Sequence, residues 1–102
     1  MNSTGCVEKL KVLADNTRLA VINKLFDAPK HVGELARTLN IEQSLLSHHL
    51  GVLRKSGIVN AVRDGKSVLY HLAPGINGVK NQRAINLGCC ELTFPRLKNK
   101  VK

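Results

Sequence analysis

The chain has 102 residues, which is long enough for one domain with a single hydrophobic core and too short for two. Hydrophobic residues make up 43% of it, but with two Phe, one Tyr and no Trp the core must consist mainly of Leu, Val, Ile and Ala. Sixteen basic against seven acidic residues give a formal net charge of +9, which is typical of nucleic-acid-binding proteins but also of basic proteins that bind no polyanion.

The N-terminal segment lacks the pattern of a signal peptide, because residues 1–5 are polar and charges interrupt the apolar positions that follow. No apolar run approaches the roughly 20 residues of a membrane-spanning helix, so we expect a cytoplasmic protein that makes no membrane contact. Apolar residues at helical spacing between positions 10 and 14 predict a short first helix. The run Asp15-Asn16-Thr17-Arg18 is a capping signal for a second helix, which Pro29 is expected to end.

Two further helices follow in close succession. Apolar positions recur every three or four residues from Val32 to Leu39 and again from Leu46 to Leu53. The first pattern stops at Asn40, which tolerates the left-handed conformation common at helix ends, and the second closes at Ser56-Gly57. Because only two residues separate Asn40 from the next helical segment, the pair is predicted to form a helix-turn-helix.

After Gly57 the hydrophobic pattern changes to alternation, with β-branched residues on both sides of Asp64-Gly65. This pattern predicts a β-hairpin with a type I′ turn, whose two central residues have positive φ. A β-hairpin directly after a helix-turn-helix is a wing. The predicted fold class is therefore mainly α with a β-hairpin (α+β), a winged helix-turn-helix of order ααααββ.

The sequence predicts a division of the chain at about position 74. Residues 1–74 are expected to form the DNA-binding domain, and residues 75–102 a C-terminal extension with the Cys89-Cys90 pair, a possible dimer contact and a basic tail. Glycines, asparagines and Pro95 interrupt any helical period in this extension, while two short stretches alternate like strands. Its structure stays open.

The second helix of a helix-turn-helix enters the major groove with its first residues toward the base edges. Side chains that can pair with bases or phosphates occupy this position, and basic residues follow at the helix end and beside the hairpin turn. The predicted DNA-binding residues are Gln43, Ser44, Ser47, His48, Arg54, Lys55, Arg63 and Lys66. Each of these residue types alone also occurs on many solvated helices, so the prediction depends on their combination. His48 is expected to point outward and His49 to be partly packed, so a metal ion shared by both is not expected.

Several ordered motifs resemble those of a known family. They are Leu13-Ala14-Asp15-Asn16-Thr17-Arg18-Leu19, Gly33-Glu34-Leu35-Ala36, Gln43-Ser44-Leu45-Leu46-Ser47-His48-His49-Leu50, Leu53-Arg54, Ser56-Gly57-Ile58-Val59, Arg63-Asp64-Gly65-Lys66 and Tyr70-His71-Leu72. Over roughly residues 8 to 74 the chain resembles the ArsR/SmtB family of metal-sensing winged-helix repressors. The resemblance implies a homodimer that represses by occupying an inverted-repeat operator in double-stranded DNA and dissociates when it binds an inducer.

The chain also departs from the family pattern. Asn16 stands where the family usually has proline. Val32-Gly33-Glu34-Leu35 replaces the Cys-Val-Cys type motif that many members carry in their third helix. Neither the ligand pairs of zinc-sensing members nor a long C-terminal dimer helix is evident, so the usual dimer geometry is not implied.

The cysteines are the candidate inducer site. Three cysteines in a small chain without a secretory signal argue against a disulfide scaffold and for free thiols, metal ligation or redox chemistry. Thiolates are soft ligands, and three of them suit trivalent arsenic or antimony. Because the first and last helices pack together at the dimer interface of the family that the chain resembles, we hypothesise an arsenite or antimonite site formed by Cys6, Cys89 and Cys90, within or between subunits. No permanently bound cofactor is expected.

Other readings of the same residues remain open. The thiols also fit a cadmium, lead or zinc site completed by His71, His31 or Glu91, a redox or persulfide switch, or no sensory role at all. A non-specific architectural DNA-binding protein is the alternative from another class. An enzyme is not expected, because the chain has no CxxC pair, no phosphate-binding glycine loop and no HExxH motif. A thiol enzyme using Cys89 is the remaining enzymatic alternative.

Overall fold

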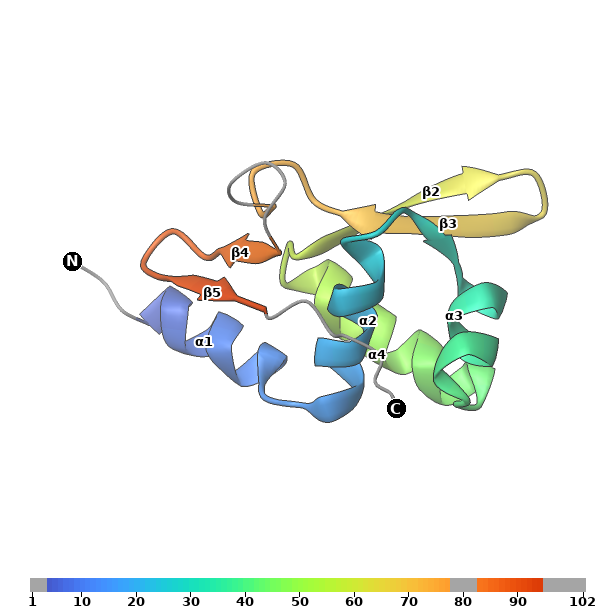
Figure 1. The fold of residues 1–102 in the computed structure, drawn as a ribbon, viewed down its shortest axis with the longest axis horizontal. Coiled ribbons are helices and arrows are strands. Elements are labelled where there is room, and N and C mark those ends of the chain that lie inside the picture. The colour runs from blue at the N-terminus through green and yellow to red at the C-terminus, as the bar shows by residue number, and fades with distance from the viewer. Residues whose placement is uncertain (1–3, 78–82, 95–102) are drawn as a thin grey trace, which may run out of the picture.

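The computed structural model describes residues 4–77 and 83–94 of the chain. Within these ranges the helices are α1 (Thr4–Leu13), α2 (Asn16–Leu25), α3 (Val32–Leu39) and α4 (Gln43–Lys55). The strands are β1 (Lys30–His31), β2 (Val59–Asp64), β3 (Ser67–Leu72), β4 (Ala84–Asn86) and β5 (Glu91–Thr93). The β2–β3 wing projects from one end of the molecule, and α1 with β4 and β5 forms the opposite end (Figure 1). The predicted winged helix-turn-helix is confirmed.

Helix α2 begins where its capping signal predicts. The Oδ1 atom of Asp15 accepts a hydrogen bond of 3.0 Å from the backbone N–H of Arg18, one of the amides that the start of a helix leaves unpaired. The helix ends at Leu25, so the end expected at Pro29 was placed too late. The reason is strand β1, which pairs Lys30 with Tyr70 of β3 and therefore needs extended backbone directly after Pro29. This short strand was absent from the predicted element order.

Helices α3 and α4 form the helix-turn-helix, and both end as the sequence predicts. Asn40 closes α3 in the left-handed conformation, with φ of 55°. Gly57, with φ of 78°, follows the last turn of α4 and directs the chain into the wing. The first turn of α3 is stabilised by Glu34, whose carboxylate accepts a hydrogen bond from the backbone N–H of His31 at 3.4 Å.

The wing is an antiparallel hairpin whose turn differs from the predicted one. Asp64 pairs with Ser67, so the two turn residues are Gly65 and Lys66 rather than Asp64 and Gly65. Gly65 has a φ of 64°, whereas Lys66 is not among the residues with positive φ, which fits a type II′ turn with glycine first. The prediction of type I′ was therefore wrong, because cross-strand pairing of Asp64 takes it out of the turn.

The C-terminal segment, which the sequence left open, forms a second hairpin rather than a helix over the described residues 83–94. Strand β4 pairs antiparallel with β5, from Ala84 opposite Thr93 to Asn86 opposite Glu91. Arg83 connects this hairpin to the end of α2: its guanidinium donates to the Oδ1 atoms of Asn23 and Asp27 and lies 5.1 Å from the centre of the Phe26 ring. The hairpin is thereby held against α2.

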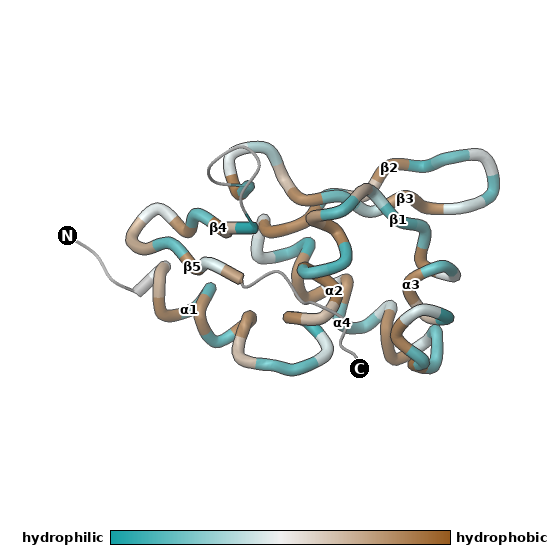
Figure 2. Tube along the Cα trace, viewed as in Figure 1, coloured by the Kyte–Doolittle hydropathy of each residue, from teal (hydrophilic) through white to brown (hydrophobic). Residues whose placement is uncertain are grey.

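One hydrophobic core includes residues from both the winged domain and the C-terminal hairpin. Figure 2 shows hydrophobic stretches of the helices gathered in the middle of the molecule. The fully buried side chains of Leu46, Leu50 and Leu53 line one face of α4. Ile85 of β4 is equally buried, and Leu87 is 6% exposed, in the same cluster. The C-terminal hairpin therefore packs directly on the core that supports α4.

Candidate DNA-reading helix and thiol site

The residues predicted to read DNA lie on the surface of α4, away from its buried leucines. Gln43, Ser44, Ser47 and His48 are exposed at the start of the helix. Because Leu46, Leu50 and Leu53 anchor the opposite face, these four side chains are held on a rigid element and face solvent. His49 is partly packed, as expected, with a side chain that is only 12% exposed. The arrangement presents hydrogen-bonding groups of the kind that pair with base edges.

The predicted basic residues extend this surface in two directions. Arg54 and Lys55 are exposed in the last turn of α4, and Arg63 and Lys66 are exposed at the tip of the wing. The tip of the wing is connected to the start of α3 by a contact that the sequence did not predict, in which Nε2 of His31 lies 2.8 Å from the Asp64 carboxylate. The basic side chains can therefore meet phosphates on both sides of the reading helix.

One apolar residue on the reading helix was missed by the sequence analysis. Leu45 is 48% exposed, although it stands between Ser44 and the buried Leu46. The sequence does contain a signal for it, since Leu45 lies outside the apolar stripe of an amphipathic helix, where the side chain is normally polar. In the major groove, an apolar side chain in this place can contact the methyl group of thymine.

A partly buried polar network behind the reading helix was also missed. Arg18 donates from Nη1 to Nδ1 of His49 at 2.9 Å and from Nε to the carbonyl oxygen of Val12 at 2.5 Å. The His49 ring also lies 4.0 Å from the Asp15 carboxylate. The hydrogen bond from the Arg18 backbone, more than the nearby positive charges, lowers the pKa of the Asp15 carboxyl below its usual 3.8. The contacts to His49 join residues that are far apart in sequence, so no local pattern reveals them.

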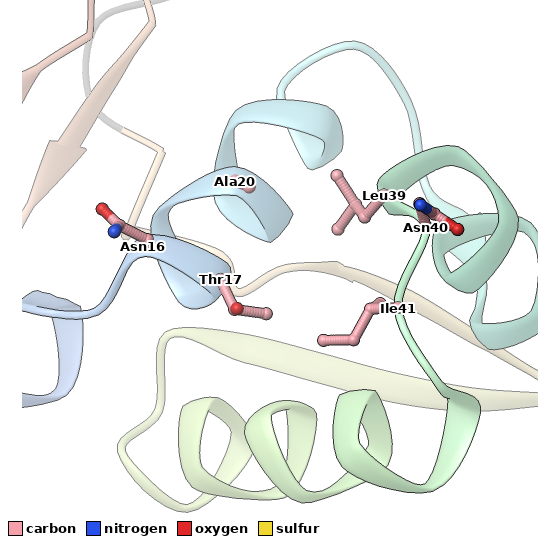
Figure 3. A pocket seen from close by; sticks show the side chains of 6 residues that line it. All are labelled: Asn16, Thr17, Ala20, Leu39, Asn40 and Ile41. Atoms are coloured by element: carbon pink, nitrogen blue, oxygen red, sulfur yellow. The ribbon is translucent and has the colours of Figure 1, made fainter.

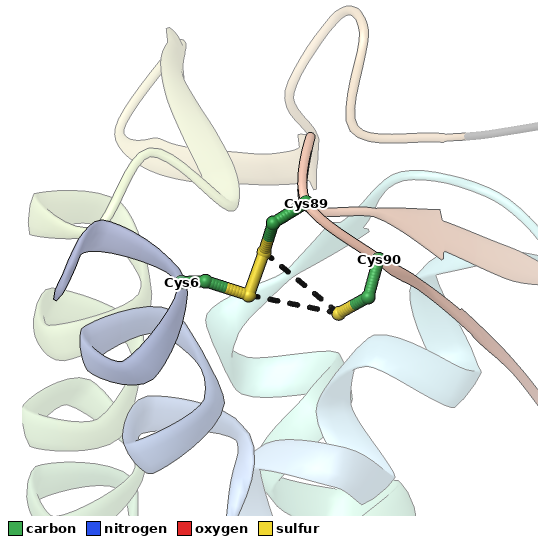
Figure 4. Close-up of side chains that lie close together, drawn as sticks. All are labelled: Cys6, Cys89 and Cys90. Carbon is green, nitrogen blue, oxygen red and sulfur yellow. Dashed lines mark hydrogen bonds between the residues drawn. A yellow bond between two sulfur atoms is a disulfide. The ribbon is translucent and has the colours of Figure 1, made fainter. Parts of the chain in front are cut away.

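The three cysteines lie together at the other end of the molecule (Figure 4). Cys6 and Cys89 form a disulfide with a Cα–Cα distance of 6.1 Å. The free thiol of Cys90 lies 3.7 Å from the sulfur of Cys6 and 3.9 Å from that of Cys89. All three sulfur atoms are within 4.8 Å of one another. Sequence positions 83 residues apart thus converge on one small site within a single chain.

The turn between β4 and β5 presents the cysteine pair toward α1. The backbone N–H of Leu87 donates to the carbonyl oxygen of Cys90 at 2.9 Å, and that of Gly88 donates to the Asn86 side chain at 2.8 Å. Leu87 is buried while Cys89 and Cys90 are exposed, so the turn is anchored on the core and its two cysteines lie at the surface. The thiol site is therefore accessible to small solutes.

The other candidate metal ligands do not join the thiols in this chain. His31 contacts Asp64 in the wing, and Nδ1 of His71 lies 3.0 Å from the carbonyl oxygen of Leu72. Among the described residues, the group of three or more potential ligand side chains consists of the cysteines alone, without Glu91. A four-ligand site completed by His71, His31 or Glu91 is therefore not assembled within one subunit.

A surface pocket lies between the start of α2 and the turn that joins α3 to α4 (Figure 3). Its lining residues are Asn16, Thr17, Ala20, Leu39, Asn40 and Ile41. None of them is ionisable or a thiol, and none is a predicted site residue. No described helix is long and apolar enough to cross a membrane.

Comparison with known proteins finds a family match over a region that contains the helix-turn-helix. Residues 15–61 match the family model described as bacterial regulatory protein, arsR family. The transcriptional activator HlyU of Vibrio cholerae is 40% identical over 72 residues, which cover 71% of this chain and 67% of HlyU. The transcriptional repressor SmtB of Mycobacterium tuberculosis is 39% identical over 66 residues, which cover 65% of this chain but 49% of SmtB. The chain thus spans two thirds of one relative and about half of the other.

Solved structures show the same fold. Reduced HlyU from Vibrio cholerae superposes with a TM-score of 0.69 at 39% identity, covering 72% of this chain and 78% of HlyU. The homodimeric winged helix-turn-helix DNA-binding domain Mb0332 from Mycobacterium bovis has a TM-score of 0.65 at 26% identity, covering 68% of this chain and 64% of that domain. Cys6, Cys89 and Cys90 all lie outside the 15–61 family match. Similarity of that region therefore does not account for the thiol site.

Proposed function

Because this chain belongs to the arsR family of bacterial regulatory proteins, we propose that it is a homodimeric repressor that leaves an inverted-repeat operator when its cysteines bind arsenite or antimonite. The observation that carries the inducer half is the convergence of the three sulfur atoms of Cys6, Cys89 and Cys90 within 4.8 Å. The DNA-binding half is supported by the exposed polar start of α4 and the basic residues that flank it.

The chemistry of the thiol site favours a three-coordinate metalloid. Arsenous acid exchanges its three hydroxyl groups for three thiols and releases three water molecules, which gives a pyramidal arsenic with three As–S bonds and no change of oxidation state. Thiolates are soft ligands, and they bind trivalent arsenic better than they bind hard cations. A tetrahedral zinc ion would need a fourth ligand, which the described residues of one chain do not supply at this position. The site takes arsenite only when the Cys6–Cys89 disulfide is reduced.

The test uses the reduced full chain and an operator selected from random duplex DNA. We expect arsenite to release wild-type protein from the labelled operator in fluorescence anisotropy, together with ultraviolet absorption from arsenic–thiolate charge transfer. The matched variant Cys6→Ser/Cys89→Ser/Cys90→Ser should bind the operator equally well and ignore arsenite. Release of the triple variant by arsenite, or normal operator binding by wild type at saturating arsenite, would contradict the proposal.

The same titration with cadmium, lead and zinc separates the metalloid from the other metal inducers. The preference for operator over random DNA, measured at one salt concentration, separates a specific repressor from an architectural DNA-binding protein. Both bind phosphates through basic residues, so both weaken as salt rises. A repressor binds its operator typically 10³-fold or more tighter than random DNA at the same salt concentration. Equal affinity for the operator and for random duplex DNA would favour the architectural alternative.

A thiol redox switch is the second candidate function, favoured by the disulfide between Cys6 and Cys89. Its Cα–Cα distance of 6.1 Å is within the usual range for disulfides. The Cys90 sulfur, 3.7 Å and 3.9 Å from the two bonded sulfurs, is close enough for thiol–disulfide exchange after a small movement. Under this alternative, oxidation of the metal-free protein by a disulfide reagent changes operator affinity, and a thiol reductant restores it.

A further inference from the structure

Arg18 is hydrogen-bonded to two other helices from its position in the first turn of α2. Its Nε donates to the Val12 carbonyl oxygen in the last turn of α1, at 2.5 Å. Its Nη1 donates to Nδ1 of His49 in the middle of α4, at 2.9 Å. A single side chain thus connects α1, α2 and α4.

The chemistry of these contacts makes the connection specific. The carbonyl groups of the last helical turn lack partners within the helix, so the Val12 carbonyl is free to accept from Arg18. The guanidinium is planar with its donors in a fixed fork, so it can hold two acceptors in different directions at once. Because a guanidinium only donates, Nδ1 of His49 must be the acceptor, which leaves the ring proton on Nε2. The His49 side chain is 12% exposed and is therefore shielded from competition by water.

The two partners of Arg18 lie on the two elements that the proposed function must couple. Helix α1 carries Cys6 as well as Val12, so a displacement of α1 at the thiol site also moves the Val12 carbonyl. His49 is adjacent to the exposed His48, and their ring centres lie 5.6 Å apart. Rotation or translation of α4 at His49 therefore changes the position of a predicted base-reading side chain.

We propose that Arg18 and His49 are positioning residues for DNA recognition: their hydrogen bond sets the orientation of α4 relative to the end of α1. This inference rests on the proposed function for its second half, in which the same contact transmits the state of the thiol site to the reading residues. Neither residue is required to touch DNA or the metalloid.

The experiment compares Arg18→Met and His49→Leu, which abolish the hydrogen bond, with His49→Asn, whose Oδ1 atom takes the place of Nδ1 as acceptor. Lys11→Met is the charge-matched control, because it removes one exposed positive charge from α1. Thermal unfolding first establishes that each variant is folded. Operator affinity is then measured by anisotropy in reduced protein with and without arsenite, and arsenic–thiolate absorption is recorded in parallel.

We expect Arg18→Met and His49→Leu to bind the operator about tenfold more weakly and to lose most of the arsenite-dependent change in affinity, with unaltered arsenic–thiolate absorption. His49→Asn and Lys11→Met should stay close to wild type in both measurements. The inference would be overturned if Arg18→Met matched wild-type affinity. If the variant were weakened but kept the full arsenite response, the second half of the inference would be overturned, because the contact would then orient α4 without transmitting the state of the thiol site.

Failure of the proposed function has a different signature. Wild-type protein would then show no arsenic–thiolate absorption and no release by arsenite. In that case the positioning role is decided by the reduced protein alone: weaker operator binding by Arg18→Met and His49→Leu, rescued in His49→Asn, supports it. Equal binding by all four variants would overturn it.

Discussion

Asp15 links a single side chain to the position of a whole helix. Its carboxylate caps α2 and lies 4.0 Å from His49 on the reading helix. The cap could be predicted from the sequence, because it needs only an Asp three positions before the residue whose backbone N–H it accepts from. The contact with His49 could not, because it depends on how α2 packs on α4.

Replacing Asp15 should therefore weaken the fold in a pH-dependent way. We expect Asp15→Ala to lower the free energy of unfolding by about 1 kcal/mol near neutral pH, because the cap acceptor is lost. The hydrogen bond from the Arg18 backbone lowers the pKa of Asp15 in the folded state, so the stabilisation that comes from the ionised carboxylate is present above the ordinary value of 3.8 and is lost as the pH falls through the lowered pKa. Urea unfolding at several pH values measures this difference. Asp15→Asn keeps a neutral acceptor and is the control, and a difference between wild type and Asp15→Ala that did not shrink in strong acid would contradict the assignment.

Leu45 leads to a prediction about base recognition. If its exposed side chain contacts a thymine methyl group, replacing that thymine by uracil should weaken wild-type binding about fourfold, since burial of one such group contributes about 0.8 kcal/mol. Scanning the operator with uracil, one position at a time, identifies the base. Leu45→Ala should bind the thymine and uracil operators equally well at that position. Equal loss in both proteins would show that another residue reads the methyl group.

At the scale of elements, the helix-turn-helix could be predicted and the second hairpin could not. The spacing of Leu46, Leu50 and Leu53 reflects burial on one helix face, which is a local pattern. The strands on either side of Cys89-Cys90 are three residues long each, too short for alternation to identify them. Their position depends on Arg83 and on burial of Ile85 against distant residues. The turn of the wing was predicted one residue too early, at Asp64-Gly65 instead of Gly65-Lys66. Which residues occupy the turn depends on how β2 pairs with β3, and a local pattern does not contain that information.

The connection through Arg83 gives a prediction for the C-terminal hairpin. Arg83→Met removes its hydrogen bonds to the Asn23 side chain and to Asp27, and with them the cation that lies on the Phe26 ring. We expect faster hydrogen exchange of the β4 and β5 amides and faster reaction of the reduced cysteines with a thiol reagent, because the hairpin opens more often. Asp27→Asn is the milder comparison, since the Asp27 side chain is 55% exposed. Unchanged exchange in Arg83→Met would mean that packing of Ile85 alone holds the hairpin.

The hydrogen bond from Arg83 also lowers the pKa of the Asp27 carboxyl below 3.8. The stabilisation that this pair contributes is therefore present above that value and is lost as the pH falls through the lowered pKa. Acid should therefore destabilise the hairpin of Asp27→Asn less than that of the wild type, because the variant lacks the ionised Asp27 that pairs with Arg83. Hydrogen exchange of the hairpin amides across the acid range, corrected for the intrinsic pH dependence of exchange, measures it.

At the scale of the whole molecule, the disulfide joins the N-terminal helix to the C-terminal hairpin across 83 residues. Closing a loop of this length restricts the unfolded chain, so the oxidised protein should be more stable than the reduced one by up to about 4 kcal/mol. Urea unfolding with and without a thiol reductant measures the difference. The stability of Cys6→Ser should not respond to reductant, and equal stability of oxidised and reduced wild type would contradict the prediction.

The burial of Ile85 and Leu87 in the core beneath α4 has a genetic consequence. A premature stop codon that removed the cysteine pair together with β4 would also remove two core side chains, and each truncation to that extent typically costs several kcal/mol. Such alleles should lose the regulator altogether, rather than yield one that stays on its operator. A selection for alleles that repress permanently should therefore return missense changes at the cysteines, and no nonsense changes upstream of codon 85.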